Sequence, residues 1–402
     1  MVKDIKNIKD FAFTQVDNLK KEFEEISDFI FKNPELGNEE FISSRFIVDK
    51  MEGYGFKLQY PYCGLETAFR AEFGDDEGPV IAFLAEYDAL PGYGDNGELG
   101  HACGHNWISA TTVGAAMVLL QVKEELNFKG KIVLIGTPAE ETTGGKCNLV
   151  ESGAFKDIDV AFQLHLEAFN NLNCKALAMD SIEFNFKGKA AHAASHPHLG
   201  VNALDSVQLM FAGVNALRQH VKSDVRIHGI VTQGGVAPNI VPDLCQCKFY
   251  IRANERKYLI EVTEKVINCA RGAAIMTGSQ LDYRNFENPY DNIINITKLQ
   301  SIMMENMNSL GINDFVVSSE GPTGSTDIGN VSQVCPTMYG EMSLDISPMV
   351  YVHEKEFLDH ANSEEAYEKM QIAIKSMVGS ALDIYFNTEL LKVIKEEFNN
   401  KI

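Results

Sequence analysis

The apolar runs Val80-Ile-Ala-Phe-Leu84 and Ile132-Val-Leu-Ile135 enclose a long segment, Ile108–Leu126, that is rich in Ala, Met, Val and Leu. Short uninterrupted apolar runs indicate strands that are buried on both faces, as in a parallel sheet. The segment between them has the length and composition of a helix. A strand, a helix and a strand at this spacing predict a βαβ unit, which Val160-Ala-Phe-Gln-Leu164 continues.

The pattern of apolar residues changes after residue 180. Ile182, Phe184 and Phe186 alternate with polar residues, which is typical of a strand with one buried face. The elements that follow are predicted as a helix, two strands, a helix and a strand, over 202–221, 227–232, 245–253, 255–276 and 280–286. The resulting order, β-α-β-β-α-β, is that of a ferredoxin-like unit.

Together the two patterns predict an α/β protein in which a small domain interrupts a larger one. The larger domain comprises residues 1–179 and 296–402, and we expect a mixed, mostly parallel sheet flanked by helices. Two of these helices are expected within residues 13–54, on either side of a break at Pro34-Glu-Leu-Gly37. The insert, residues 180–295, is expected to be a ferredoxin-like α+β lid.

Composition and charge exclude several classes of protein. A chain of 402 residues with 45% apolar and 23% charged residues is ordinary for a globular enzyme of two domains. The formal net charge of -21 argues against a nucleic-acid or anionic-membrane partner, which needs a basic surface. The charged start, Met1–Asp10, is unlike a signal peptide, and no apolar run reaches the roughly 18 residues of a membrane span. The 8 cysteines include no Cys-x-x-Cys pair, so we expect free thiols and a cytoplasmic protein.

Metal-binding types of side chain follow three of the predicted strands. Cys103 and His105 lie in a glycine-rich loop after the first strand, Glu140 and Glu141 follow the second, and His165 ends the third. The carboxyl ends of neighbouring parallel strands open on one crevice. Thiolate, imidazole and carboxylate are the ligands that divalent transition metals prefer. The sequence therefore predicts a metal-assisted hydrolase.

Each of these residues also has a purely structural interpretation. Cys103 can also be interpreted as a buried thiol beside a polar loop histidine, since free cysteine is among the most buried residue types. Glu140 and Glu141 can also be interpreted as two solvated glutamates at the start of a helix, where the helix dipole favours negative charge. His165 fits a hydrogen-bonded core histidine. Only the combination of the five residues favours a metal site.

Two carboxylates lie just after the first strand. Asp88 could orient a ligand imidazole through a hydrogen bond. Its alternative interpretation is a residue of the turn before Ala-Leu-Pro91. Glu86 can be interpreted simply as a polar residue near the edge of the sheet.

At these residues the chain resembles the metallopeptidase family of aminoacylases, hippurate hydrolase, auxin-conjugate amidohydrolases and succinyl-diaminopimelate desuccinylase. The matching stretches run in the family's order over nearly the whole chain: Asn33-Pro-Glu-Leu36 with Glu40, Glu86-Tyr-Asp88-Ala-Leu-Pro91, His101-Ala-Cys-Gly-His105-Asn106, Pro138-Ala-Glu140-Glu141, Gly188-Lys-Ala-Ala-His192-Ala, Pro238-Asn239-Ile-Val-Pro242 and Ser325-Thr-Asp327. The stretches around Glu86 and Cys103 are most similar to the branch of p-aminobenzoyl-glutamate hydrolase and its animal dipeptidase relatives. Hippurate-type members usually carry aspartate where this chain has Glu86 and Asn106.

The resemblance implies a role for each ligand candidate. Cys103 would bridge two divalent ions per subunit (Zn, Mn, Co or Ni), and Glu140 would act as general base. The other ligands would be His105, Glu141, His165 and His353. The context of His353 matches the family's C-terminal histidine motif only loosely, and His360 is its rival.

The resemblance also implies roles for the inserted domain. His192 would reach into the site of a partner subunit and polarise the scissile carbonyl, which requires a homodimer formed through this lid and dimerisation domain. Asn239 and Arg252 would approach the substrate, at its carboxylate. A polar loop with incidental imidazoles is the structural interpretation of His192, and a surface ion pair is that of Arg252.

The activity expected from the resemblance is hydrolysis of the amide bond of small N-acyl- or aminoacyl-amino acids, of p-aminobenzoyl-glutamate or dipeptide type, by a metal-activated water. The alternatives are a different acyl-amino-acid substrate such as an N-acetyl amino acid, a non-catalytic homologue that binds a metal or ligand, and a thiol enzyme with Cys103 as nucleophile and His105 as base. Activity of a thiol enzyme would survive chelation of the metal.

Overall fold

The computed structural model describes residues 4–94, 97–316 and 324–402, and its chain divides into two units that each have a core of their own. The first unit contains the described residues of Met1–Cys174, Ile293–Glu320 and Asn330–Ile402. The second unit contains Lys175–Asn292 and a returning segment that ends at Gly329.

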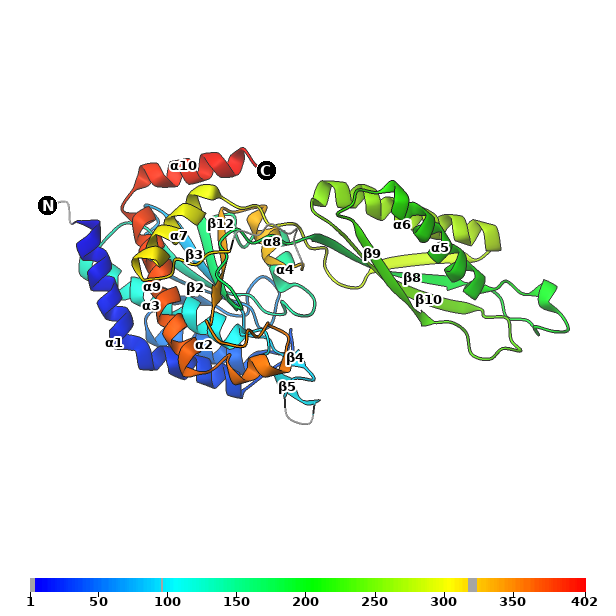
Figure 1. Cartoon of the computed structure of the whole chain (residues 1–402), viewed down its shortest axis with the longest axis horizontal. Helices are drawn as coiled ribbons and strands as arrows, with labels where there is room; N and C mark the ends of the chain where they lie inside the picture. The colour runs from blue at the N-terminus through cyan, green and yellow to red at the C-terminus, as the bar shows by residue number, and fades with distance from the viewer. Residues whose placement is uncertain (1–3, 95–96, 317–323) are drawn as a thin grey trace. The chain divides into compact units, whose positions relative to one another are not determined.

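A 6-stranded sheet forms the centre of the first unit, in the order β1-β2-β6-β3-β7-β12 (Figure 1). The strands β6, β3, β7 and β12 are parallel, while β2 runs antiparallel to β6 and β1 antiparallel to β2. The predicted mixed, mostly parallel sheet is therefore confirmed. Its strands are β1 (Lys57–Gln59), β2 (Phe69–Gly74), β3 (Val80–Ala85), β6 (Lys131–Gly136), β7 (Val160–Glu167) and β12 (Thr337–Ser343), and a separate pair consists of β4 (Leu90–Pro91) and β5 (Leu99–Gly100).

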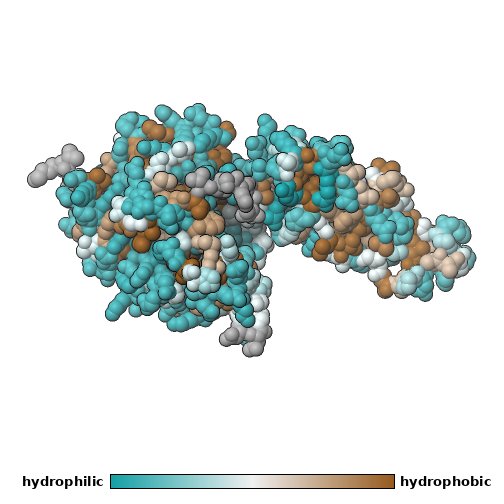
Figure 2. Space-filling model, in the orientation of Figure 1, coloured by the Kyte–Doolittle hydropathy of each residue, from teal (hydrophilic) through white to brown (hydrophobic). Residues whose placement is uncertain are grey.

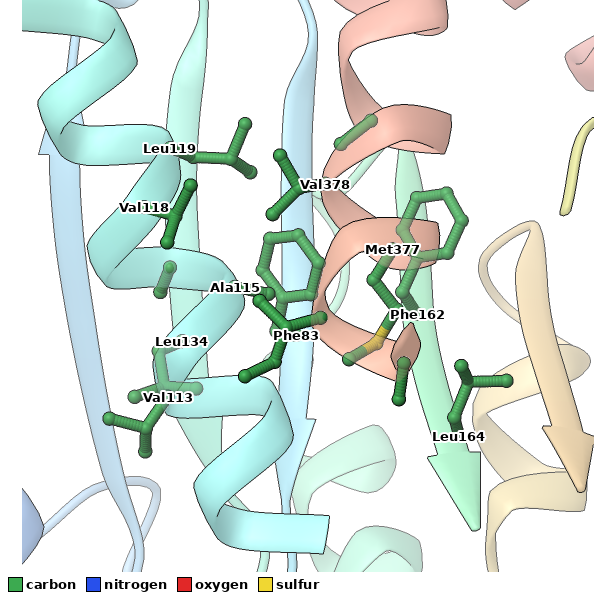
Figure 3. Close-up of a cluster of buried hydrophobic side chains, with 14 of the residues drawn as sticks. Phe83, Val113, Ala115, Val118, Leu119, Leu134, Phe162, Leu164, Met377 and Val378 are labelled. Carbon is green, nitrogen blue, oxygen red and sulfur yellow. The ribbon is translucent and has the colours of Figure 1, made fainter. Parts of the chain in front are cut away.

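Helix α3 lies against β6, β3 and β7, and α1 and α9 pack beside it. Figure 3 shows Phe83 of β3 and Phe162 of β7 packed beside α3 and α9, and their ring centroids are 5.9 Å apart. Burying an aromatic or aliphatic side chain of this kind stabilises the fold by about 1.5–3 kcal/mol. The helices of this unit are α1 (Ile5–Lys32), α2 (Phe41–Gly53), α3 (His105–Leu126), α4 (Gly145–Glu151), α7 (Thr297–Ser309), α9 (Glu364–Tyr385) and α10 (Thr388–Asn399), with a 3-10 turn over Lys355–Asp359. The short α8 (Ile328–Ser332) leads back from the second unit.

Helix α3 begins at His105, earlier than the expected start at Ile108. The reason is Gly104, whose φ of 75° is the left-handed conformation that glycine adopts without steric strain. The chain can therefore turn sharply from the loop into the helix. Its first helical residue is consequently one of the predicted site residues.

The second unit contains an antiparallel sheet of 4 strands in the order β11-β8-β10-β9, packed against helices α5 and α6. Its elements are β8 (Ala178–Lys187), α5 (Ala203–Leu217), β9 (Arg226–Gln233), β10 (Leu244–Ala253), α6 (Arg256–Thr277) and β11 (Gln280–Asn285), with 3-10 turns at Pro197–Leu199 and Arg218–His220. The burial of β10 alternates along the strand, because one face packs on the helices and the other does not. The predicted β-α-β-β-α-β order is confirmed.

Within the described ranges, no helix combines the length and the apolarity that a bilayer crossing requires.

Candidate metal centre and active site

The predicted ligand residues of the first unit meet at the carboxyl ends of its parallel strands. Glu86 and Asp88 follow β3, Glu140 and Glu141 follow β6, and His165 lies near the end of β7. The loop after β3 then brings in Cys103 and His105. Potential ligand atoms lie within 4.8 Å of one another in three groups, which are Cys103 with His105 and His165, Cys103 with Glu141 and His353, and His105 with Glu140 and Glu141.

Cys103 is shared by two of these groups. Its Sγ lies 3.4 Å from His165 Nε2 and 3.2 Å from His353 Nε2. His353 Nε2 is in turn 3.0 Å from Glu141 Oε1. The Cys103 thiol therefore lies between two imidazoles and is a candidate ligand in both groups.

The two buried histidines direct their Nε2 atoms into this cluster. His105 Nδ1 lies 2.9 Å from Asp88 Oδ1, and His165 Nδ1 lies 2.7 Å from the carbonyl oxygen of Leu166. Both partners can only accept, so Nδ1 carries the hydrogen in the neutral rings and Nε2 is left to bind a metal. His105 Nε2 is buried without a hydrogen-bond partner among the described residues. The donor set and this unpartnered nitrogen fit a divalent transition-metal ion.

Asp88 connects two of the ligand candidates. Its Oδ1 accepts from His105 Nδ1, and its Oδ2 accepts the backbone N–H of Glu141 at 2.9 Å. The side chain is 0% exposed, so these bonds form away from competing water. These contacts with a predicted ligand imidazole and with the backbone of Glu141 are compatible with the orienting role expected of Asp88.

The charges within the cluster are strongly coupled. Burial opposes the charged form of His105, but Asp88, Glu86 and Glu141 outweigh it and raise the pKa of His105 to about 10. Burial, with Glu141 and Glu140 beside it, raises the pKa of the Cys103 thiol well above its ordinary value. Burial also lowers the pKa of His165 to about 4. The metal-free site therefore holds protons that a metal ion would displace.

The side chains of Glu140 and Glu141 reach the same site, whereas consecutive side chains of an extended segment point to opposite faces. They lie in a turn, and an oxygen of each is within 4.8 Å of a nitrogen of His105. The turn starts at Ala139, whose φ of 62° is uncommon for a residue other than glycine. Both carboxylates can consequently serve one site.

The structure favours His353 over His360 as the last ligand candidate. His353 Nε2 contacts both Cys103 and Glu141, whereas the backbone N–H of His360 closes the 3-10 turn at Phe357. His353 has a φ of 65°, and its backbone N–H donates to the carbonyl oxygen of Ala102 at 2.8 Å. This bond joins the loop of His353 to the loop of Cys103.

A buried ion pair next to the cluster was not predicted. Lys146, at the start of α4, contacts Glu86, whose other oxygen is 3.6 Å from His105 Nε2. Glu86 is therefore more than a polar residue at the sheet edge. A lysine soon after Glu140-Glu141 was the available signal, but lysine is usually exposed and its burial is not visible in the sequence.

The remaining predicted residues, His192, Asn239 and Arg252, belong to the second unit. His192 is exposed, and its Nδ1 accepts the backbone N–H groups of Ala194 and Ser195 at 3.3 Å each. The neutral ring therefore carries its hydrogen on Nε2.

The other two residues of the second unit differ in exposure. Asn239 is exposed and adjoins the His192 loop, where its carbonyl oxygen accepts the N–H of Ala193. Arg252 is half-buried on β10, its guanidinium lies 5.6 Å from the Tyr250 ring centroid, and its Nε is buried without a partner in the described chain. An unsatisfied guanidinium of this kind can bind an anionic group.

Several known proteins are similar to this chain in sequence or in fold. The chain is 36% identical to the Xaa-Arg dipeptidase of Mus musculus over 98% of this chain and 93% of that protein. It is 34% identical to a p-aminobenzoyl-glutamate hydrolase subunit of Escherichia coli over 73% of this chain and 63% of that protein. The fold is similar to that of a dinuclear metal-binding peptidase of the M20 family from Bacillus subtilis, with a TM-score of 0.65 and 21% identity over 93% of this chain and 99% of that one.

The family resemblance predicted from the sequence motifs is confirmed by a match over residues 82–376. The expectation of a hydrolase that acts on peptide or amide bonds is confirmed with it. The chain belongs to peptidase family M20/M25/M40.

Proposed function

We propose that this protein is a metal-dependent hydrolase of small aminoacyl- or acyl-amino acids, with dipeptides and p-aminobenzoyl-glutamate as the substrate types to test first. The observation that carries the proposal is the position of Cys103, whose Sγ is shared by two groups of ligand atoms beside Glu140 and Glu141. The dipeptidase and p-aminobenzoyl-glutamate hydrolase among the relatives support the choice of substrates.

The residues that would hold two divalent ions are Cys103, His105, Glu141, His165 and His353. Bound ions supply Lewis-acid polarisation of the carbonyl and a water of near-neutral pKa. A thiolate ligand favours Zn, Co or Ni, while imidazole and carboxylate also suit Mn. Asp88 and the carbonyl of Leu166 keep the Nε2 atoms of His105 and His165 directed into the site.

Glu140 would act as the general base. It takes a proton from the attacking water, whose oxygen forms the new bond to the carbonyl carbon. The C–N bond then breaks, and Glu140 returns the proton to the departing nitrogen, so that a carboxylic acid and an amine are released. Its place in the turn, with an oxygen within 4.8 Å of atoms from His105 and Glu141, supports this role.

The second unit would supply the remaining groups. His192 would donate from Nε2 to the developing oxyanion in the site of a partner subunit, and its Nδ1 contacts favour the required tautomer. Arg252 and Asn239 would bind the carboxylate of the substrate. This assignment requires a homodimer formed by residues 180–295, which act as lid and dimerisation domain.

The edge of the second sheet supports the dimer. Strand β9 is an edge strand, and its Ile230 and Val231 are 64% and 47% exposed. Figure 2 shows further hydrophobic side chains on the visible face of this unit. An exposed apolar edge strand readily pairs with another chain. Ile230→Lys should therefore convert dimers to monomers in sedimentation-velocity experiments, and an unchanged sedimentation coefficient would exclude this edge as the interface.

Substitution of Glu140 tests the activity. Glu140→Gln should retain its metal content but lose on the order of 10²–10⁴-fold in turnover of a dipeptide panel. The matched control is Glu151→Gln, an exposed glutamate at the end of α4, which should retain wild-type turnover. Full activity of Glu140→Gln would refute the base assignment.

Chelation separates the proposal from its rivals. EDTA should abolish activity, and Zn, Mn, Co or Ni should restore it. Activity that survives EDTA would favour a thiol enzyme with Cys103 as nucleophile, and inactivity on every substrate with full metal occupancy would favour a binding protein. The 8 free cysteines support a cytoplasmic protein, which cell fractionation can test.

A further inference from the structure

The segment 33–40, which carries the family-like motif Asn33-Pro-Glu-Leu36 and Glu40, has no part in the proposed chemistry. We propose that Glu40 is a positioning residue that holds the turn of Glu140 and Glu141 in its active shape by accepting the backbone N–H of Ala139. This inference rests on the proposed function, because it assigns Glu40 a role through the base and the ligand of that site.

Glu40 is a fully buried carboxylate with one bond to each oxygen. Its Oε1 accepts the N–H of Ala139 at 2.7 Å, and its Oε2 accepts the hydroxyl of Thr67 at 2.8 Å. Its side chain is 0% exposed. The contact with Ala139 joins residues that are 99 positions apart in the sequence, so it is purely tertiary.

Ala139 is the residue whose conformation sets the turn. Its φ of 62° is a left-handed conformation that an alanine does not adopt without support from its surroundings. Its carbonyl oxygen accepts the N–H of Gly144 at 2.8 Å, which closes the turn on the other side. The bond from Glu40 therefore fixes the Pro138–Ala139 peptide, on the N-terminal side of the residue that precedes Glu140.

Other residues of the segment 33–40 also contact the turn that contains Glu140 and Glu141. A Cβ placed on Gly37 would lie 2.2 Å from Thr142 Oγ1 and 2.8 Å from Ala139 Cα, so the two backbones are in direct contact there. Asn38 Nδ2 donates to Thr143 Oγ1 at 3.0 Å.

Glu35 connects the same segment to the loop that carries Asp88. Its carbonyl oxygen accepts the N–H of Ala89, next to Asp88, at 2.8 Å. Its carboxylate accepts the N–H groups of Ile42 and Ser43, which anchors the segment to the start of α2. The segment thus connects the loop of Asp88 with the turn of Glu140 and Glu141.

The buried environment of Glu40 is energetically unfavourable for a charged carboxylate, so stability alone does not explain a glutamate at this position. Burial and the neighbouring Asp88 raise the pKa of Glu40 to about 7, which reflects the unfavourable environment of its charge. Within the described chain no lysine or arginine forms an ion pair with it. What the site requires is an acceptor that reaches Ala139, since the N–H of a backbone peptide can only donate.

Three variants separate this role from general stability. Glu40→Leu removes the acceptor and should lower kcat about a hundredfold with little change in KM, as expected when catalytic groups shift by about 1 Å. Glu40→Gln should remain within a few fold of wild type, because its amide oxygen accepts from Ala139 and its NH2 donates to Thr67. Thr67→Val removes only the other bond, and should lower the melting temperature without lowering kcat.

Should Glu40→Leu fail to fold, Glu40→Asp keeps the charge but shortens the side chain, and a similar loss of kcat is expected. Zn2+ affinity, measured by calorimetry, should fall about 10–100-fold in Glu40→Leu and Glu40→Asp because Glu141 belongs to the same turn. Wild-type kcat and Zn2+ affinity in Glu40→Asp, or a Glu40→Gln variant as impaired as Glu40→Leu, would overturn the proposal. If Glu140→Gln remains active, the base assignment fails, yet the Zn2+ affinities still decide the role of Glu40.

Discussion

Lys146 Nζ lies 2.5 Å from Glu86 Oε1, and the two side chains are 0% and 2% exposed. Burial opposes the charged form of Glu86, but Lys146 and His105 outweigh it and lower the pKa of Glu86 to about 2. A buried ion pair stabilises a fold weakly compared with an apolar pair of the same shape, whereas removal of one partner leaves a buried unpaired charge. The pair therefore supplies a fixed, compensated carboxylate beside His105.

Removal of Lys146 alone should be more harmful than removal of both partners. Lys146→Met should lower the free energy of unfolding by up to about 3–5 kcal/mol, because the buried Glu86 carboxylate loses the ammonium group that contacts it. The double variant Glu86→Leu with Lys146→Met should recover much of this loss. Urea denaturation of the three proteins measures both effects, and equal losses in the single and double variants would contradict the assignment.

Asp88→Asn should weaken metal binding. One oxygen becomes an NH2 group, so the side chain can no longer accept from both His105 Nδ1 and the N–H of Glu141. Loss of such an orienting partner typically costs about 10–100-fold in metal affinity. Calorimetric titration with Zn2+ measures the change, and Asp49→Asn on the exposed face of α2 is the control. Identical affinities of Asp88→Asn and wild type would show that Asp88 is only a turn residue.

Metal affinity should rise with pH. The raised pKa values of Cys103 and of His105, the latter about 10, mean that both groups hold a proton at neutral pH in the metal-free protein. A metal ion must displace these protons, so affinity is lost as the pH falls and protons are released on binding. Zn2+ titrations in buffers of different ionisation enthalpy measure this release. Binding heats that do not depend on the buffer would be inconsistent with it.

Glu341→Gln should stabilise the protein at alkaline pH. Glu341 accepts a hydrogen bond from Asn171, and burial raises its pKa from 4.5 to about 7. The folded state then binds more protons than the unfolded state between these values, so stability falls as the pH rises through this window. The neutral glutamine avoids this loss, which we expect to be roughly 1–3 kcal/mol at pH 8 and absent at pH 4. Urea denaturation at both pH values tests it, and a gain of equal size at the two would refute the titration of Glu341.

Much of the fold could be predicted because its signals are local. The apolar runs around Phe83 and Phe162 and the alternation at Phe184 each depend on a few neighbouring residues. The short strands β1 and β2 were not predicted, since three-residue strands and a run broken by Arg70 and Glu72 give little periodicity. The predicted start of helix α3 was three residues too late. Gly104 allows the helix to begin at His105 through its left-handed φ, which the sequence alone does not reveal.

The amino-acid sequence by itself determined the order of the elements and the chemical identity of the ligand candidates. The preference of thiol, imidazole and carboxylate groups for metals follows from residue type, and the meeting of strand ends follows from parallel pairing. Only the tertiary structure decided that His353 rather than His360 reaches Cys103, that Lys146 neutralises Glu86, and that Glu40 holds Ala139. These contacts join residues far apart in the chain through hydrogen bonds and burial, and such contacts leave no periodic trace in a single sequence.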